Sequence, residues 1–362
     1  MNKKIILVFV IILIIFGIVY FEKMKPKAPD ETNIGKNEAE IKEGKFLKAP
    51  ELVGISGYLN TEEGLKISDL KGKVVLIDFW TYTCINCIRT LPFLVEWDEK
   101  YRDDGLVIIG VHTPEFPFEK EYANVKMAME KYGIKYPVVQ DNDYATWNAY
   151  KNRYWPHKYL IDAEGFIRYD HIGEGAYDET EKKIQELLGE IGKDVSEGTT
   201  EIEDKTPRVR QTPELYAGYE FALPRGQNLG NDGGMKPDEI VDYVLPDRIE
   251  KDAIYLEGKW KSNKNDLKAE EEGASIALEF TASAVNIVAD SSGDALEMEV
   301  FIDDKYVRQA QAGDDVEFDG EKAFVVVDEP RLYNVVRGEY GNYKLKLKTN
   351  SEYFSFNAFT FG

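Results

Sequence analysis

The sequence predicts an α/β three-layer domain followed by an all-β sandwich of jelly-roll type, with a single transmembrane helix near the N-terminus. Three observations lead to this prediction. Strand-like and helix-like segments alternate from Phe46 to about Gly192, as they do in three-layer domains. From residue 208 to Gly362, short strand-like segments follow one another without helices. Near the start of the chain, residues 5–21 carry no charge.

The length of the chain predicts its number of domains, and its net charge excludes some classes of function. The chain has 362 residues, more than one typical domain, so two folded domains are expected. The formal net charge is −21 and the sequence pI is near 4.7. Binding to nucleic acid needs basic patches that neutralise phosphates, so we expect no nucleic-acid partner. The acidity indicates a well-solvated surface and identifies no particular partner.

The uncharged segment near the N-terminus has the length of a membrane span. Residues 5–21, at about 1.5 Å per helical residue, would extend roughly 25 Å. The segment ends in Tyr20-Phe21-Glu22, without the small residues of a cleavage site. We therefore expect an uncleaved anchor through one helix rather than a signal peptide, with residues 1–4 in the cytoplasm. Residues 22–45 are rich in Lys, Glu, Asn and Pro and predict a flexible stalk.

Cysteine usage indicates the compartment. The chain has two cysteines, spaced as one CxxC pair, which leaves none for structural disulfides elsewhere. An exported chain of this kind fits the outer face of a plasma membrane. We expect a single-pass plasma-membrane protein whose catalytic domains lie on the extracytoplasmic side.

Residues 46–192 are expected to form the α/β domain around a mostly parallel sheet. Val74–Phe79 is an unbroken apolar run, as expected for a strand that is buried on both faces. The other expected strands are Leu106–Val111, Tyr136–Val139, Lys158–Ile161 and Phe166–Tyr169, the last two as a hairpin. The expected helices are Thr90–Tyr101, Phe118–Tyr132, Asp143–Tyr150 and Asp178–Ile191.

A polar, acidic stretch at residues 193–207 is expected to link the two domains. Residues 208–362 are then expected to form the β-sandwich. Its expected strands are short and separated by turn residues: Ala274–Phe280, Ala284–Ala289, Leu296–Ile302, Phe324–Val327, Arg331–Val336, Tyr343–Lys348 and Phe354–Phe361.

The cysteine pair, Cys84 and Cys87, lies where an apolar strand gives way to a helical segment. A structural zinc site needs four ligands, and with three histidines and no third cysteine we expect no metal. A structural disulfide closing a ring of about four residues would stabilise the fold by only about 2 kcal/mol, against about 4.7 for a hundred-residue loop. Thiol–disulfide exchange is the interpretation that remains.

The spacing of the pair fits this chemistry. A thiolate is the attacking species, and the first turn of a helix favours it through unpaired N–H groups and the positive end of the dipole. Three residues further on, Cys87 faces Cys84 and can close a redox-active Cys84–Cys87 disulfide. We assign Cys84 as the exposed nucleophile and Cys87 as the more buried resolving cysteine.

Two nearby features would support the pair. Asp78 lies in the apolar strand, where burial raises a carboxyl pKa and allows it to take a proton from the resolving thiol; hydrogen bonding at a strand end is the alternative. Pro156 directly precedes a strand, and a cis Trp155–Pro156 bond there would present the Trp155 backbone to a client protein; an ordinary trans proline is the alternative.

Aromatic and titratable neighbours are further candidates. Trp80 and Trp155 are candidates for an apolar, client-binding rim around the thiols, with core packing as the alternative. His112 and Glu115 are candidates for tuning the thiol pKa or receiving protons, with loop capping or a structural hydrogen bond as the alternative.

Taken together, Asp78-Phe79-Trp80, the CxxC pair, Pro92 and Pro156 resemble the thioredoxin superfamily. The segment from about residue 118 to 150 resembles the insertion of its TlpA-like branch. The likeness is greatest to the C-terminal region of DipZ-type proteins, in which a thioredoxin-like domain precedes a carbohydrate-binding-module-like sandwich. Residues 80–87, 112–116 and 359–362 carry this likeness.

The resemblance implies a membrane-anchored thiol–disulfide oxidoreductase that exchanges disulfides with extracytoplasmic protein thiols and disulfides. No cofactor is expected. DipZ-type proteins begin with a multi-span electron-transfer domain, whereas this sequence has one apolar segment. We therefore expect the electron donor to be a separate membrane protein.

Two other functions stay open on the residues alone. Thr81 lies three positions before Cys84, as in the Thr-x-x-Cys signature of peroxiredoxins, which would make the chain a thiol peroxidase; Ile77 stands where that family has proline. A non-enzymatic protein would instead bind a glycan or protein ligand through the sandwich. Its candidate sugar-stacking residues, which can equally fill the core, are Tyr255, Trp260, Tyr333, Tyr340, Tyr343 and Tyr353.

Overall fold

The computed structural model describes residues 41–42, 45–195 and 198–362. It divides into two units, residues 1–48 and 49–362. In the first, strand β1 (Ile41–Lys42), which lies in the predicted stalk, pairs antiparallel with β2 (Phe46–Leu47), at the start of the predicted α/β domain. The predicted anchor at residues 5–21 lies outside the described residues. None of the helices that the structure does describe is both long and apolar enough to cross a bilayer.

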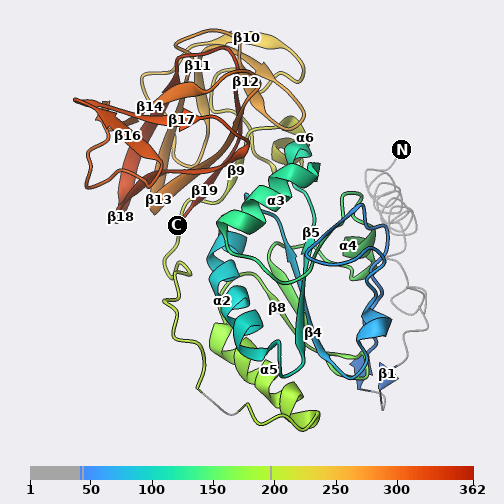
Figure 1. The fold of residues 1–362 in the computed structure, drawn as a ribbon. Helices are drawn as coiled ribbons and strands as arrows, with labels where there is room; N and C mark the ends of the chain where they lie inside the picture. The colour runs from blue at the N-terminus through green and yellow to red at the C-terminus, as the bar shows by residue number, and fades with distance from the viewer. Residues whose placement is uncertain (1–40, 43–44, 196–197) are drawn as a thin grey trace, which may run out of the picture. The chain divides into compact units, whose positions relative to one another are not determined.

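The α/β domain is built on a six-stranded sheet, drawn in the lower part of Figure 1. The strand order is β3-β6-β5-β4-β7-β8. Their bounds are β3 (Gly57–Leu59), β4 (Val74–Trp80), β5 (Leu106–His112), β6 (Val138–Gln140), β7 (His157–Ile161) and β8 (Ile167–Ile172).

The sheet is mixed, so the prediction of a mostly parallel sheet was wrong. Strands β4, β5 and β6 are parallel neighbours, as in crossover units. The other three pairings, β3 with β6, β4 with β7 and β7 with β8, are antiparallel. The predicted hairpin of β7 and β8 explains part of this, because a hairpin is antiparallel and β7 joins the sheet beside β4.

Helices cover both faces of the sheet (Figure 1). Helices α2 (Ile85–Tyr101), α3 (Tyr122–Lys131) and α5 (Tyr177–Glu190) share one apolar core with the sheet. The 3₁₀ helix η1 (Ile67–Leu70) and α4 (Ala145–Ala149) share a second core on the opposite face. The predicted helix over residues 118–132 is interrupted: a 3₁₀ turn, η2 (Pro117–Lys120), precedes α3, and Glu121 between them is extended.

Strand β4 is buried along its whole length, as predicted. Its side chains alternate between the two cores because successive residues of a strand point to opposite faces. Val74, Leu76 and Trp80 pack in the core beneath α2, whereas Val75, Ile77 and Phe79 pack in the other. This alternation places Asp78 on the α2 face, the side that carries Cys87.

The C-terminal region is an antiparallel β domain, drawn in yellow to red in Figure 1. All eleven strands belong to one hydrogen-bonded sheet. Their bounds are β9 (Leu215–Tyr216), β10 (Ile240–Tyr243), β11 (Tyr255–Ser262), β12 (Leu267–Ala269), β13 (Ser275–Ser291), β14 (Leu296–Ile302), β15 (Lys305–Tyr306), β16 (Val316–Asp319), β17 (Lys322–Val327), β18 (Arg331–Thr349) and β19 (Phe354–Phe361). A short helix α6 (Tyr219–Ala222) and a 3₁₀ turn η3 (Leu223–Arg225) follow β9.

Two predicted breaks between strands are absent in the β domain. The expected strands 274–280 and 284–289 are one continuous strand, β13, and the expected strands 331–336 and 343–348 are one strand, β18. The pairing of β13 with β18 shifts register twice, between Ala282 and Ala284 and between Val285 and Asn286. Such bulges bend a strand without ending it, which explains why turn-like residues do not mark a strand end here.

The β domain packs directly against the α/β domain. Phe116, which follows β5, is only 2% exposed and belongs to the core of the β domain. Its ring lies 6.1 Å from that of Phe221 in α6. The predicted linker is also held: Lys100 in α2 donates to the Gly198 carbonyl, 2.5 Å, and the Thr200 N–H donates to Glu181 in α5, 2.7 Å.

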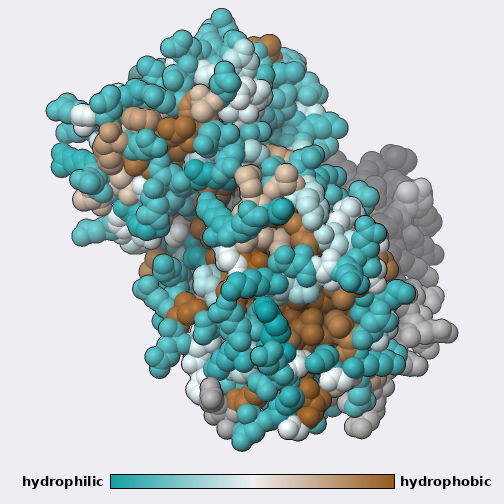
Figure 2. Space-filling model, in the orientation of Figure 1, coloured by the Kyte–Doolittle hydropathy of each residue, from teal (hydrophilic) through white to brown (hydrophobic). Residues whose placement is uncertain are grey.

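The surface is mostly hydrophilic on the face shown in Figure 2, with brown areas scattered among teal ones. This agrees with a sequence in which 31% of residues are charged. The structure thus places the candidate thiols in an α/β domain that packs against a second, all-β domain.

Candidate active site

The cysteine pair lies at the N-terminus of α2, directly after β4. Cys84 is the N-cap of this helix, and its sulfur accepts a hydrogen bond from the Cys87 N–H at 3.3 Å. The helix begins at Ile85, five residues before the expected start at Thr90, and Pro92 lies within it. Cys84 therefore occupies the position at which unpaired N–H groups and the helix dipole favour an anion.

The two thiols differ in exposure. Cys84 is half-buried, whereas Cys87 is 1% exposed, and both are free thiols in this structure. The Cys84 thiol also contacts the Trp155 carbonyl oxygen, 3.8 Å away. Burial raises the pKa of the Cys87 thiol well above its usual value, and the neighbouring Cys84 and Asp78 raise it further. This is the exposure difference expected of an attacking and a resolving cysteine.

Asp78 is enclosed beneath α2, with 1% of its surface exposed. Its Oδ1 has no hydrogen-bond partner among the described residues, so the alternative of a hydrogen-bonded strand-end carboxyl is not supported. Burial raises the pKa of Asp78 from 3.8 to about 7, although the charge of Lys158 acts in the opposite direction. At neutral pH this carboxyl can therefore both accept and return a proton.

Lys158 is a buried site residue that the sequence analysis missed. It is the register partner of Asp78 in the antiparallel pairing of β4 with β7, and its side chain is 0% exposed. Its Nζ donates to the Gly173 carbonyl at 3.0 Å, and burial lowers its pKa. In the sequence, Lys158 begins the otherwise apolar run 158–161, and a charged residue at the start of a buried strand can indicate a functional site.

The loop opposite the thiols contains the predicted cis bond between Trp155 and Pro156, which the structure confirms. Trp155 is half-buried, and its indole N–H donates to the Thr113 carbonyl at 3.0 Å. Pro156 itself is buried, directly before β7. The Trp155 backbone is thereby held next to the Cys84 sulfur.

For Trp80 the alternative of core packing holds, and a place in the client-binding rim does not. Trp80 is 0% exposed and packs in the core beneath α2. A Cβ added to Gly110 on the neighbouring strand would lie 2.8 Å from the Trp80 indole nitrogen, so glycine is required there. The ring fills the space between β4 and β5 and does not reach a client.

His112 is likewise part of the interior. It is 0% exposed, its Nε2 lies 3.4 Å from the Thr81 hydroxyl, and its ring stacks on Tyr82 at 5.7 Å. Burial lowers the pKa of His112 to about 3, so it is neutral at physiological pH. The structural alternative therefore holds for His112.

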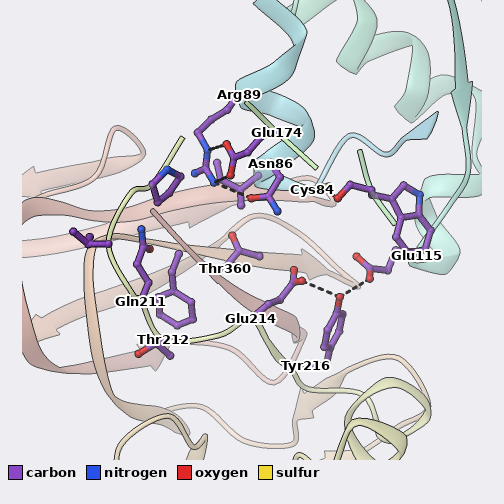
Figure 3. A pocket seen from close by; sticks show the side chains of 15 residues that line it. Cys84, Asn86, Arg89, Glu115, Glu174, Gln211, Thr212, Glu214, Tyr216 and Thr360 are labelled. Carbon is purple, nitrogen blue, oxygen red and sulfur yellow. Dashed lines mark hydrogen bonds and ion pairs between the residues drawn. The ribbon is translucent and has the colours of Figure 1, made fainter. Parts of the chain in front are cut away.

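Cys84 opens into a pocket of about 270 Å³ that both domains line. One wall comes from the N-terminus of α2 and from Trp155. The other wall comes from the segment that leads into the β domain, including Gln211, Glu214 and Tyr216, and from the end of β19 (Figure 3). No local pattern in the sequence predicts that the β domain faces the thiols.

Glu115 is the accessory candidate that does line this pocket. The Tyr216 hydroxyl lies 2.6 Å from the Glu115 carboxyl and 3.0 Å from that of Glu214. On the opposite side, Arg89 donates twice to Glu174, at 2.6 and 2.8 Å, and once to Asn86, at 2.8 Å. Of these residues only Glu115 was a candidate. Glu174, Glu214 and Tyr216 lie far from the cysteines in the sequence, whereas Asn86 and Arg89 lie close to them but are not residue types that the exchange chemistry needs.

Half of the aromatic candidates for sugar binding are core residues. Tyr255, Trp260 and Tyr333 are 4%, 0% and 0% exposed, which excludes stacking on a ligand. Tyr340 and Tyr353 are about half exposed, at 49% and 47%. The alternative of core filling thus applies to three of the six candidates.

A CxxC pair at a helix N-terminus, beside a buried carboxyl and a cis-proline loop, defines the thioredoxin-like class. Sequence comparison agrees for both domains. Residues 48–170 match the AhpC/TSA family, and residues 212–362 match the thioredoxin-like C-terminal domain family.

One relative shows to which family the chain belongs. The thiol-disulfide oxidoreductase YkuV of Bacillus subtilis is 31% identical over 142 residues, which cover 39% of this chain and 94% of that protein. The chain therefore belongs to the thioredoxin-like thiol–disulfide oxidoreductases.

Two further matches extend the comparison. Protein DipZ of Mycobacterium tuberculosis is 42% identical over 253 residues, which cover 68% of this chain but 35% of DipZ, so the chain spans about a third of that relative. Among solved structures, a thiol-disulfide isomerase from Corynebacterium glutamicum is 26% identical, with 39% of this chain and 96% of that chain covered and a TM-score of 0.36.

Proposed function

We propose that this protein exchanges disulfides with client proteins, with Cys84 as the nucleophile and Cys87 as the resolving cysteine. The observation that carries the proposal is the position of Cys84. Its sulfur caps α2, accepts the Cys87 N–H at 3.3 Å and lines an open pocket, whereas Cys87 is enclosed behind it. A client sulfur can reach Cys84 but not Cys87.

The proposed reaction has two exchange steps. The Cys84 thiolate attacks one sulfur of a client disulfide, forms a mixed disulfide and releases the other client sulfur as a thiolate. Cys87, once deprotonated, attacks the Cys84 sulfur, which forms the Cys84–Cys87 disulfide and releases the second client sulfur as a thiolate. Asp78 is the base for the Cys87 proton, because it lies on the α2 face of β4 and has a pKa near neutrality. In the opposite direction the same steps oxidise a client dithiol.

Trp155 and Pro156 are proposed to hold the client chain. The Trp155 carbonyl contacts the Cys84 sulfur at 3.8 Å, and Trp155 lines the pocket. An extended client segment that pairs with this backbone would bring its sulfur to Cys84.

The test is capture of clients by the single-cysteine variants. Cys87→Ser is expected to accumulate mixed disulfides through Cys84, which appear as reductant-sensitive adducts on non-reducing gels. Cys84→Ser, the matched control, is expected to trap none. Equal amounts of adduct in both variants would contradict the assignment of Cys84 as nucleophile.

Membrane anchoring is part of the proposal. The uncharged residues 5–21 support one anchor helix, and the two domains are proposed to lie on the extracytoplasmic side of the plasma membrane. The electron donor is then proposed to be a separate membrane protein. Alkaline extraction of membranes tests the anchor, and protease protection in intact cells tests the side: release by alkali contradicts the first, and protection contradicts the second.

The β domain is proposed to be a carbohydrate-binding-module-like sandwich that binds a glycan or a protein. The exposed rings of Tyr340 and Tyr353 support a ligand on its surface. Glycan-array binding that is lost in Tyr353→Ala and retained in Cys84→Ser would separate this role from the redox chemistry. Equal binding by wild type and Tyr353→Ala would exclude Tyr353 from a glycan site.

A thiol peroxidase is the second candidate, and the match of residues 48–170 to the AhpC/TSA family favours it. In that case Cys84 would reduce a peroxide rather than attack a disulfide. Stopped-flow measurement of peroxide consumption by the reduced protein distinguishes the two. Turnover of peroxide that is faster than disulfide exchange would make the peroxidase the primary function.

A further inference from the structure

Two carboxyl groups in the pocket share one hydroxyl (Figure 3). Glu115 follows β5 in the α/β domain, whereas Glu214 and Tyr216 belong to the β domain. The Tyr216 oxygen lies 2.6 Å from Glu115 Oε1 and 3.0 Å from Glu214 Oε2. Both carboxyl groups converge on this oxygen from opposite sides in the close-up view.

This geometry provides a place for a further proton. A tyrosine hydroxyl has one hydrogen and can donate it to only one of the two carboxyl groups. The second contact, at 3.0 Å, becomes a full hydrogen bond when the other carboxyl group carries a proton and donates it to the tyrosine oxygen. The geometry of the Glu115–Tyr216–Glu214 group therefore accommodates one more proton than two ionised carboxylates would hold.

The surroundings favour retention of this proton. Desolvation and the charges of Glu214 and Glu119 raise the pKa of Glu115, and its hydrogen bond to Tyr216 and the charge of Arg225 only partly oppose this.

The charged and titratable groups that face Glu115 and Glu214 come from several elements. Glu119 in η2 accepts the Glu115 N–H at 2.5 Å and also the Thr83 hydroxyl at 2.5 Å, so its carboxylate is occupied. The Arg225 guanidinium stacks on the Tyr216 ring at 4.5 Å. Tyr144 completes the set, since the Glu115 charge acts on it.

The Glu115 and Glu214 carboxyl groups face the pocket in which exchange at Cys84 is proposed to take place. Cys84, Glu115, Glu214 and Tyr216 all line the same pocket of about 270 Å³. That volume is near the lower limit of ligand pockets and accommodates a short stretch of chain. A client sulfur bonded to Cys84 would therefore share a small space with a carboxyl group that carries a proton.

We propose that the Glu115–Tyr216–Glu214 group is the proton donor and acceptor for the client sulfur during exchange at Cys84. This inference rests on the proposed function. When Cys84 attacks a client disulfide, the Cys84–client bond forms, the client S–S bond breaks, and its electron pair leaves on the second client sulfur. The shared proton passes to this thiolate and yields a client thiol and two ionised carboxylates, which regain a proton from solvent through the exposed Glu214.

Protonation of the departing sulfur makes the step productive. A thiolate is the nucleophile in exchange, whereas a thiol is not, so the protonated product cannot attack the mixed disulfide and reverse the reaction. In the oxidising direction the ionised pair would accept the proton from an incoming client thiol. In both directions the β domain contributes chemistry to the thiols of the α/β domain.

The test compares two disulfides that differ in leaving group. The full-length, reduced protein is mixed in a stopped-flow instrument with a synthetic peptide that contains a disulfide between two alkyl thiols, and separately with the aromatic disulfide dithionitrobenzoate. The aromatic product is stable as a thiolate and needs no proton, whereas the alkyl thiolate does. Rates are measured for wild type, Tyr216→Phe and Glu214→Gln.

We expect Tyr216→Phe and Glu214→Gln to slow exchange with the peptide disulfide by about tenfold or more, a modest share of the usual contribution of general acid catalysis. Their rates with dithionitrobenzoate are expected to stay at the wild-type value, which also shows that the variants are folded and that the Cys84 thiol is intact. Tyr219→Phe is the matched control, because its hydroxyl contacts Asp238 away from the pocket, and it is expected to match wild type with both reagents.

The outcomes separate this proposal from the proposed function. Loss of rate with the peptide disulfide alone supports the proton role. Equal loss with both reagents, or no loss with either, overturns it while leaving the exchange function intact. Failure of the reduced wild-type protein to react with either disulfide would instead overturn the proposed function itself.

Discussion

Asp78 and Lys158 are direct partners in the antiparallel pairing of β4 with β7, and both side chains are enclosed, at 1% and 0% exposed. Burial pushes each towards its neutral form, because charge is costly in an apolar interior. Their mutual attraction opposes that shift. The two groups are therefore coupled through their charges, and Asp78 also acts on the pKa of the resolving cysteine.

Asp78→Asn is expected to make stability less dependent on pH. The pKa of Asp78 is about 7 in the folded protein against 3.8 ordinarily, so between these values the folded state binds more protons than the unfolded state. Stability then falls as pH rises, by about 4 kcal/mol over the full window. Asparagine removes this loss but leaves Lys158 without its partner, so we expect the variant to be more stable than wild type by about 2 to 4 kcal/mol at about pH 8.

Chemical denaturation at several pH values checks this prediction. The difference between Asp78→Asn and wild type should shrink towards zero at about pH 4, where Asp78 is protonated. Asp103→Asn, at an exposed position, is the matched control and should show no such trend. A stability difference that is the same at every pH would mean that Asp78 titrates normally.

Lys158→Met is expected to slow release of the mixed disulfide at neutral pH. The Lys158 charge lowers the pKa of Asp78, so its removal should raise that pKa by about one further unit and leave about fivefold less carboxylate at pH 7 to accept the Cys87 proton. The measurement is the pH dependence of client release, whose midpoint should move upward. Lys182→Met, at an exposed position on α5, should leave the midpoint in place, and an unchanged midpoint in Lys158→Met would contradict the coupling.

Arg89→Met is expected to destabilise the protein by about 3 kcal/mol, because it leaves a largely enclosed carboxylate without its cation. The side chains of Arg89 and Glu174 are 8% and 12% exposed, and their closest contact is 2.6 Å. The double variant Arg89→Met, Glu174→Gln should recover part of the loss. Denaturation midpoints of the two single variants and the double variant give the coupling energy, and additive losses would show that the pair does not interact.

Phe116→Ala is expected to weaken the attachment of the β domain. Phe116 is 2% exposed in the core of the β domain, and truncation of a phenylalanine there costs about 3 to 5 kcal/mol. Calorimetry should resolve two unfolding transitions in the variant where the domains of the wild type unfold together. Phe118→Ala, at a half-buried position nearby, should have a smaller effect. A single, unshifted transition in Phe116→Ala would contradict a shared core.

Much of the redox site was predictable because its parts lie close together in sequence or carry a distinctive local pattern. The CxxC spacing, the acid in an apolar strand and the Trp155–Pro156 step each rest on local rules. The same rules left the roles of Trp80 and His112 open, since an aromatic or imidazole ring near a motif has the same sequence pattern whether it lines a pocket or fills a core. Lys158 was missed because only strand register brings it opposite Asp78.

The sequence by itself determined the chemistry: two thiols at the start of a helix, a carboxyl group in a buried strand and two domains of different pattern. Only the tertiary structure decided what surrounds those thiols. Glu115 and Tyr216 are 101 residues apart, and their contact depends on how the β domain packs against the edge of the sheet. Periodicity and spacing report how a segment buries its own side chains, whereas contacts between distant segments depend on the packing of complete domains.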